Sequence, residues 1–120
     1  MNRSEIREVV LKFLYSLELQ KIENNEYDEQ IQLFLDANSE EILNQIKDEL
    51  SAKWEISRLS RISLAILKLA VYEMIYAKVP YKVVINEAVE LAKKYGDDNT
   101  PAFVNGILAS VVKKNNIEEQ

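Results

Sequence analysis

The 120-residue sequence contains no cysteine and no histidine. These two absences nearly exclude a structural zinc site, and they exclude thiol catalysis and a histidine-based catalytic triad. The absence of cysteine also fits a reducing cytoplasm. Carboxylate metal sites remain open, but no calcium-loop spacing occurs. We therefore expect no metal and no organic cofactor.

Glycine and proline are also scarce, with two of each in the whole chain. So few turn residues leave little material for β-hairpins, and the one Asn-Gly pair, at 105–106, lies inside a helical pattern. No apolar run approaches the roughly 18 residues of a membrane span. The N-terminus carries charges where a signal peptide would be apolar. We expect an all-α, soluble, intracellular and cytoplasmic protein with no membrane partner.

Acidic side chains dominate the charge, which is -5 at pH 7. Residues 18–50 carry ten acidic and two basic side chains, whereas residues 51–114 carry ten basic and six acidic ones. The overall acidity therefore conceals a basic second half, which could contact nucleic acid.

Apolar spacing predicts helices along most of the chain. The expected ranges are Ser4 to Ile22, Asp28 to Asp36, one from Ser39, one from Ser57 or Ser60, Pro80 to Gly96, and Thr100 to Lys114. The fourth is apolar over much of its circumference and is expected to be central. The prediction is a single domain, a compact helical bundle of six to seven helices. Its two three-helix-type subdomains would span residues 1–56 and 57–114, with a frayed tail at 115–120.

The helix ends are signalled by four residues. Pro80 is expected to preset the first turn of one helix, and Gly96 to end it as a left-handed cap. Thr100 followed by Pro101 repeats a helix-start signal, with a hydroxyl N-cap and then proline at the first helical position.

Two asparagines interrupt apolar helical runs, Asn86 after Ile85 and Asn105 after Val104. One interpretation is that each amide hydrogen-bonds across a helix contact and fixes packing register. The other is direct contact with RNA or a partner. Gly106 costs about 1 kcal/mol relative to alanine in a helix interior. Close approach of another helix is the expected compensation.

Signals of catalysis are weak. Ser110 and Lys113 have an S-x-x-K spacing, but no oxyanion loop or further catalytic partner accompanies them. Glu87 and Glu90 lie one helical turn apart and could act as an acid–base pair, or simply solvate an exposed face. We expect no enzyme and no catalytic residue.

Two aromatic residues have alternative roles. Phe103 is expected in the first turn of the last helix, where it could stack on a base or pack against Ile107. Tyr15 lies off the main apolar stripe of the first helix and is either a boundary residue or a contact.

The segments KVVINEAVELAK (residues 82–93) and FVNGIL (residues 103–108) together resemble the NusB family of bacterial transcription antitermination factors. RISLAILKLAVYEM (residues 61–74) is similar to the family's central helix, and the N-terminus resembles the family more loosely. The resemblance is convincing over about half of the chain.

This resemblance implies a non-catalytic fold of two helical subdomains. It implies pairing with ribosomal protein NusE, binding of boxA RNA in nascent ribosomal RNA, and a place in the RNA polymerase antitermination complex. Carried over to this chain, the RNA face would comprise Arg3, Arg7, Tyr15, Lys82, Lys93 and Phe103. The NusE side would use the exposed face of the central helix, including Glu73.

The N-terminus departs from the densely basic start that is frequent in the family. Arg3, Arg7 and Lys12 stand against Glu5 and Glu8, a net charge of +1. Because phosphate contacts supply most non-specific affinity, we expect weak RNA binding by this chain alone. NusE would supply the missing positive surface.

Two other functions remain open. The chain could be a helical RNA-binding accessory related to the N-terminal part of certain rRNA 5-methylcytosine methyltransferases. If 120 residues are the whole gene product, they leave no room for an S-adenosylmethionine-binding fold, which weakens this alternative. A helical adaptor without RNA would fit the acidic pI. We expect a monomer or a weak homodimer, with the NusE heterodimer as the functional form.

Overall fold

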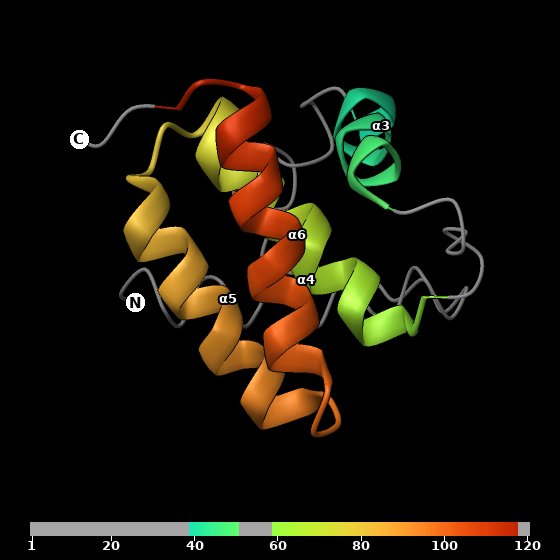
Figure 1. Ribbon diagram of the computed structural model, residues 1–120. Coiled ribbons are helices and arrows are strands. Elements are labelled where there is room, and N and C mark those ends of the chain that lie inside the picture. Colours follow the sequence, from blue (N-terminus) through green and yellow to red (C-terminus); the bar gives the residue numbers. More distant parts are fainter. Residues whose placement is uncertain (1–38, 51–58, 118–120) are drawn as a thin grey trace, which may run out of the picture.

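The computed structural model describes residues 39–50 and 59–117, and this part of the chain is all-helical (Figure 1). It comprises α3 (Ser39–Glu49), α4 (Arg61–Val71), the π-helix η2 (Tyr72–Tyr76), α5 (Tyr81–Tyr95) and α6 (Thr100–Lys114). The all-α prediction is confirmed for these residues. Within them, no helix combines the length and apolar character that a bilayer span requires. The two helices expected before Ser39 fall outside the described residues.

Helix α4 is the most buried element, as its sequence predicts. The Ser60 hydroxyl accepts a hydrogen bond from the Ser63 backbone N–H at 3.1 Å and thereby caps its first turn. Eight of its eleven residues are buried, because α3, α5 and α6 pack against different sides of it. The sequence prediction of a central helix is thus confirmed.

The helix continues past Val71 as one π-turn, which apolar spacing did not predict. At its end, the Ala77 N–H donates to the Tyr72 carbonyl at 3.0 Å and the Val79 N–H donates to the Glu73 carbonyl at 2.9 Å. Lys78 adopts a positive φ of 56°, which turns the chain away before Pro80. Tyr81 then begins α5, with Pro80 as its N-cap residue.

Helices α5 and α6 form an antiparallel pair joined by a short loop (Figure 1). Val84, Ala88 and Leu91 of α5 and Val104 and Leu108 of α6 are buried in the common core with α4. This pairing leaves one side of each helix exposed, and these two sides form the candidate site.

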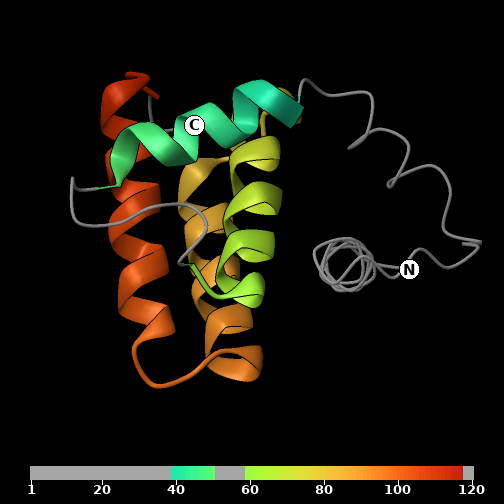
Figure 2. The same cartoon turned by 90° about the vertical axis from the view of Figure 1, so that its right-hand side faces the viewer.

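Helix α3 lies across α4 and α6 and packs against both (Figure 2). Its inward residues, Ile42 and Ile46, are at most 1% exposed and belong to the same hydrophobic core as α4–α6. Near its start, the Tyr76 hydroxyl donates a 2.5 Å hydrogen bond to the Glu41 carboxylate. The expected division into subdomains near residue 56 stays a prediction, since the boundary lies in the undescribed segment 51–58.

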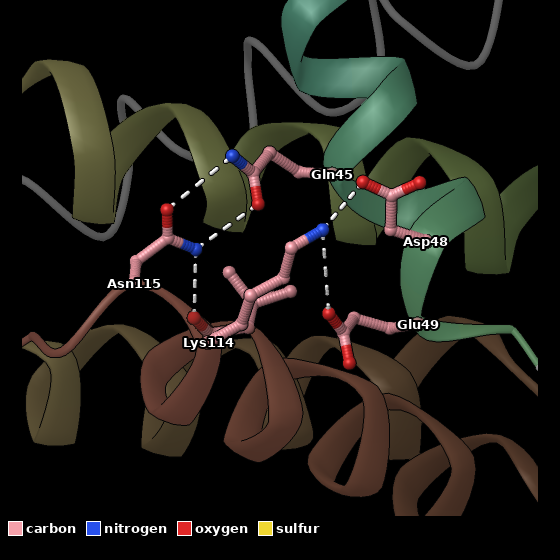
Figure 3. A network of polar contacts seen from close by, with 6 residues as sticks. Gln45, Asp48, Glu49, Lys114 and Asn115 are labelled. Atoms are coloured by element: carbon pink, nitrogen blue, oxygen red, sulfur yellow. Dashed lines mark hydrogen bonds and ion pairs between the residues drawn. The ribbon is translucent and has the colours of Figure 1, made fainter.

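A polar clasp joins the other end of α3 to the end of α6 (Figure 3). The amides of Gln45 and Asn115 exchange two hydrogen bonds, at 3.0 and 3.3 Å. The Lys114 ammonium contacts the carboxylates of Asp48 and, at 3.9 Å, Glu49. Fraying was expected to begin at residue 115. The structure instead ties Asn115 to α3, and the Ile117 N–H donates to the Val112 carbonyl.

Gly96 ends α5, but not as the left-handed cap that was predicted. Its φ of -96° and ψ of -173° are extended, a conformation open to any residue. Glycine is needed there for space, because an added Cβ would lie 2.6 Å from the Cβ and Oγ1 of Thr100.

The start of α6 also differs by one residue from the prediction. Thr100 is the first helical residue and Asn99 is the N-cap position, but Asn99 makes no side-chain capping bond. The Asp97 carboxylate instead accepts hydrogen bonds from the N–H groups of Asn99 and Thr100, at 2.9 and 3.2 Å. The Thr100 hydroxyl in turn accepts one from the Asp97 N–H at 3.1 Å. The prediction was wrong because it took the Thr100 hydroxyl, followed by Pro101, as an N-cap. The reciprocal hydrogen bonds between Asp97 and Thr100 are visible only in the structure.

Candidate nucleic-acid interface

One stripe of α5 carries both of its predicted RNA-binding lysines. Lys82, Asn86, Val89 and Lys93 follow one another at spacings of four, three and four residues. At 3.6 residues per turn, this spacing places all four on one face of the helix. Lys82, Asn86 and Lys93 are exposed and Val89 is half-buried. The structure therefore brings Lys82 and Lys93 onto a single surface, about 16 Å apart along the helix axis.

A shallow groove of about 510 Å³ runs beside this stripe, between α5 and α6. Its lining combines apolar side chains with two amides and one ammonium group. The lining residues are Tyr81, Lys82, Ile85, Asn86, Val89, Pro101, Ala102 and Asn105. None of these eight residues is acidic, although the whole chain carries a net negative charge. We call this feature the α5–α6 groove.

Both asparagines of the sequence prediction lie in the α5–α6 groove. Asn86 and Asn105 are exposed and, among the described residues, their amides have no hydrogen-bond partner, so the interpretation as amides that bond across a helix contact is wrong. Gly106 is exposed too, and a Cβ added there would meet nothing within 4 Å. The helix approach expected at Gly106 is therefore absent from the described structure. Periodicity missed this because it placed the residues in helices without showing which sides the neighbouring helices cover.

Charge on the stripe is partly balanced by α5 itself. The Lys93 ammonium lies 3.4 Å from the Glu90 carboxylate, and these side chains are 59% and 60% exposed. Such an exposed pair contributes little to stability and is screened by salt, so a phosphate could replace the carboxylate. Lys94, the next residue, lies over the Tyr95 ring, 5.3 Å from its centroid.

The structure does not bring Phe103 to the groove. Residues of an α-helix advance by about 100° each, so Phe103 lies well round α6 from Pro101 and Asn105. It is half-buried and packs against the hydrophobic core. Part of the Phe103 side chain therefore packs on the core. Contact of its exposed part with RNA stays a prediction.

The start of α6 offers less to a phosphate than a bare helix end would. The Asp97 carboxylate already accepts from the first backbone N–H groups. These bonds, first the one from Asn99, hold the pKa of Asp97 below its ordinary value, so the carboxylate remains charged there at neutral pH. An incoming phosphate would meet this negative charge first.

Glu73 was expected on an exposed face of the central helix, and that expectation of exposure is wrong. Glu73 lies in η2 and is only 6% exposed. Glu73 follows Leu69 by four residues and Ala70 by three, and both of these are buried, so the ordinary helical period places Glu73 on the buried side of the helix. Arg3, Arg7 and Tyr15 lie outside the described residues.

The described residues hold no group of three acidic, histidine or cysteine side chains that could bind a metal ion. What the α5–α6 groove offers is positive charge, amide hydrogen-bonding groups and apolar walls. These are means of binding rather than of catalysis. The sequence spacing alone could have revealed the α5 stripe of Lys82, Asn86, Val89 and Lys93. No feature of the sequence indicated which residues of α6 line the groove.

Comparison with known proteins identifies relatives over nearly the whole chain. The model of the NusB family matches residues 4–113. A transcription antitermination protein NusB of Clostridium acetobutylicum is 41% identical, with both chains covered completely. The same-named protein of Clostridium novyi is 38% identical over 94% of this chain and 99% of its own.

Solved structures agree with this. T. maritima NusB has a TM-score of 0.83 and 30% identity, covering 95% of this chain and 92% of its own. A complex described as antitermination factors NusB and NusE with dsRNA contains a chain with a TM-score of 0.76 and 28% identity. That match covers 93% of this chain and 96% of the other.

Proposed function

The chain belongs to the NusB family and is a transcription antitermination factor, not an enzyme. From this premise we propose that it pairs with ribosomal protein NusE and binds boxA RNA in nascent ribosomal RNA transcripts. The heterodimer would act within the RNA polymerase antitermination complex. The observation that carries the RNA part is the stripe of Lys82 and Lys93 beside the α5–α6 groove.

Pairing with NusE is supported by the solved relative that was described together with NusE and dsRNA. It is also supported by charge. A protein with a net charge of -5 repels the phosphate backbone at long range, so a partner that adds positive surface would help RNA to associate. RNA is then expected to lie across both proteins, with Lys82 and Lys93 neutralising phosphates on this chain.

Arg3, Arg7, Tyr15 and Phe103 remain proposed RNA contacts. Glu73 remains a proposed NusE contact, but NusE could reach only the small accessible part of this side chain. An effect of Glu73→Ala on pairing must therefore be separated from an effect on folding, by melting the variant alone.

The test is a fluorescence-anisotropy titration of labelled boxA RNA, with and without NusE, at two salt concentrations. Lys82→Ala and Lys93→Ala are compared with Lys47→Ala, an exposed lysine on α3. Each groove variant should weaken binding and flatten the dependence of log affinity on log salt by about 0.7 per lost phosphate contact. Lys47→Ala should change neither.

Three results would contradict the proposal. Unchanged affinity and salt slope in both groove variants would remove the lysines from the RNA face. Nanomolar boxA binding without NusE at about 150 mM salt would show that the partner's charge is not needed. If no RNA binds even with NusE, the adaptor function that the sequence left open becomes the better explanation. The expected weak homodimer is checked separately by analytical ultracentrifugation.

A further inference from the structure

Asn86 and Asn105 place two side-chain amides on opposite walls of the α5–α6 groove, one from each helix. Both residues are exposed, and in the part of the chain that the structure describes neither amide has a hydrogen-bond partner. The donors and acceptors of both amides therefore remain available to a ligand.

Fold stability does not explain these two residues. Asparagine is among the poorer helix formers in a helix interior, because its amide competes for backbone groups. A buried cross-helix bond would compensate for this, but both side chains lie at the surface. Departures from local sequence preference without structural compensation are expected at functional sites.

We propose that Asn86 and Asn105 hydrogen-bond to base edges of single-stranded RNA held along the α5–α6 groove, while Lys82 and Lys93 contact its phosphates. This inference rests on the proposed function and assigns the sequence-reading part of it to two residues. A primary amide presents a donor and an acceptor side by side, which matches the paired groups on a base edge. A lysine ammonium presents donors alone and suits phosphate.

The groove favours unpaired bases over a duplex. Tyr81, Ile85 and Pro101 give it apolar walls that suit the faces of exposed bases. In an A-form RNA helix, the deep and narrow major groove keeps base edges from side chains, and sequence-specific recognition falls mainly on single-stranded segments. A protein segment would also fit an apolar groove, but the lysines flanking Asn86 on the same stripe favour a polyanion.

The experiment uses the full chain with NusE and three labelled probes: boxA RNA, a scrambled RNA of the same composition, and boxA annealed to its complement. Asn86→Ala and Asn105→Ala are compared with Asn44→Ala, an exposed asparagine on α3. A bidentate amide–base contact discriminates by about 5- to 150-fold. Each groove variant should therefore lose affinity for boxA within this range and retain wild-type affinity for the scrambled and duplex RNAs. Asn44→Ala should bind all three probes like the wild type.

Circular dichroism of both variants should match the wild type, and their melting temperatures should be equal to the wild type or slightly higher, because alanine replaces a poorer helix former at an exposed position. Lys82→Ala should weaken boxA and scrambled RNA alike, which separates phosphate contact from base reading.

The inference is overturned if the variants bind boxA as tightly as the wild type does. It is equally overturned if boxA and scrambled RNA weaken together, or if the variants lose NusE binding when RNA is absent. In the last case the groove is a protein surface. If the wild-type complex binds none of the probes, the proposed function fails together with this inference, whereas wild-type binding with unaffected variants overturns the inference alone.

Discussion

The two glycines of the chain should respond in opposite ways to replacement by alanine. Gly96 closes α5 and faces the buried Thr100, whereas Gly106 lies on the exposed side of α6. Neither has a positive φ, so backbone strain plays no part in either substitution. The difference depends only on what surrounds the added methyl group.

At Gly96, the new Cβ would lie 2.6 Å from the Thr100 Cβ and Oγ1 and 2.7 Å from its Cγ2. Thr100 is 5% exposed and its hydroxyl bonds to Asp97, so it cannot move aside freely. Overpacking costs about 1–3 kcal/mol and a lost neutral hydrogen bond about 1 kcal/mol. The lower entropy of the unfolded alanine chain offsets about 0.4–1 kcal/mol of this. The expected net destabilisation is about 1–4 kcal/mol.

At Gly106, the methyl group meets nothing within 4 Å. Only helix propensity remains, which favours alanine by about 1 kcal/mol. Ala109 lies three residues further along α6 and is also exposed, so Ala109→Gly is the matched control and should cost about the same amount.

Urea unfolding followed by circular dichroism at 222 nm measures all three variants, with thermal melting as a second measurement. For a chain of this size, each kcal/mol corresponds to about 3–5 °C in Tm. A neutral or stabilising Gly96→Ala would refute the close contact with Thr100. A destabilising Gly106→Ala would show that another group packs on that side of α6.

Three further perturbations follow from the structure. Burial and then the hydrogen bond to Glu41 raise the pKa of Tyr76 from 10.0 to about 12, so folding favours the neutral phenol. The resulting stability is complete below pH 10 and is lost as the pH rises through 12. Urea unfolding at several pH values should show a smaller loss of stability in Tyr76→Phe than in the wild type. Leu108 is fully buried between the helices, so Leu108→Ala should cost about 2–5 kcal/mol in the same assay, and a cost below 1 kcal/mol would contradict its place in the core. Lys114 pairs with Asp48 at the surface, so Lys114→Met should cost less than about 1 kcal/mol and this loss should shrink in 1 M salt; a larger, salt-independent loss would indicate packing instead.

The helices themselves were largely predictable. Apolar spacing gave α4 as the buried centre, and the ends of α5 and α6 fell within about one residue of Pro80, Gly96 and Thr100. These features depend on local chemistry, namely propensity, capping and the 3.6-residue period, and the sequence contains that information directly.

The candidate site was predictable only in part. The lysines could be named from the resemblance and placed on one stripe of α5 by spacing. Asn86 and Asn105 were noticed as unusual, but one of their two interpretations, a hydrogen bond across a helix contact, does not hold. Glu73 was assigned to the surface, although it is buried. Each of these errors concerns the side of a helix that a residue occupies, and a single helix does not reveal which sides its neighbours will cover.

The sequence alone therefore determined the helical class, the buried character of α4, the helix ends and the family resemblance, because all of these depend on residues close together in the chain. Tertiary structure alone decided that α5 and α6 leave a groove, that asparagines 86 and 105 face it from opposite walls, and that the helix begun by α4 ends in a π-turn. It also decided that Gly96 is required by a side chain rather than by a backbone angle. These features depend on how distant segments pack, and close packing assigns inside and outside only once all the helices are in place.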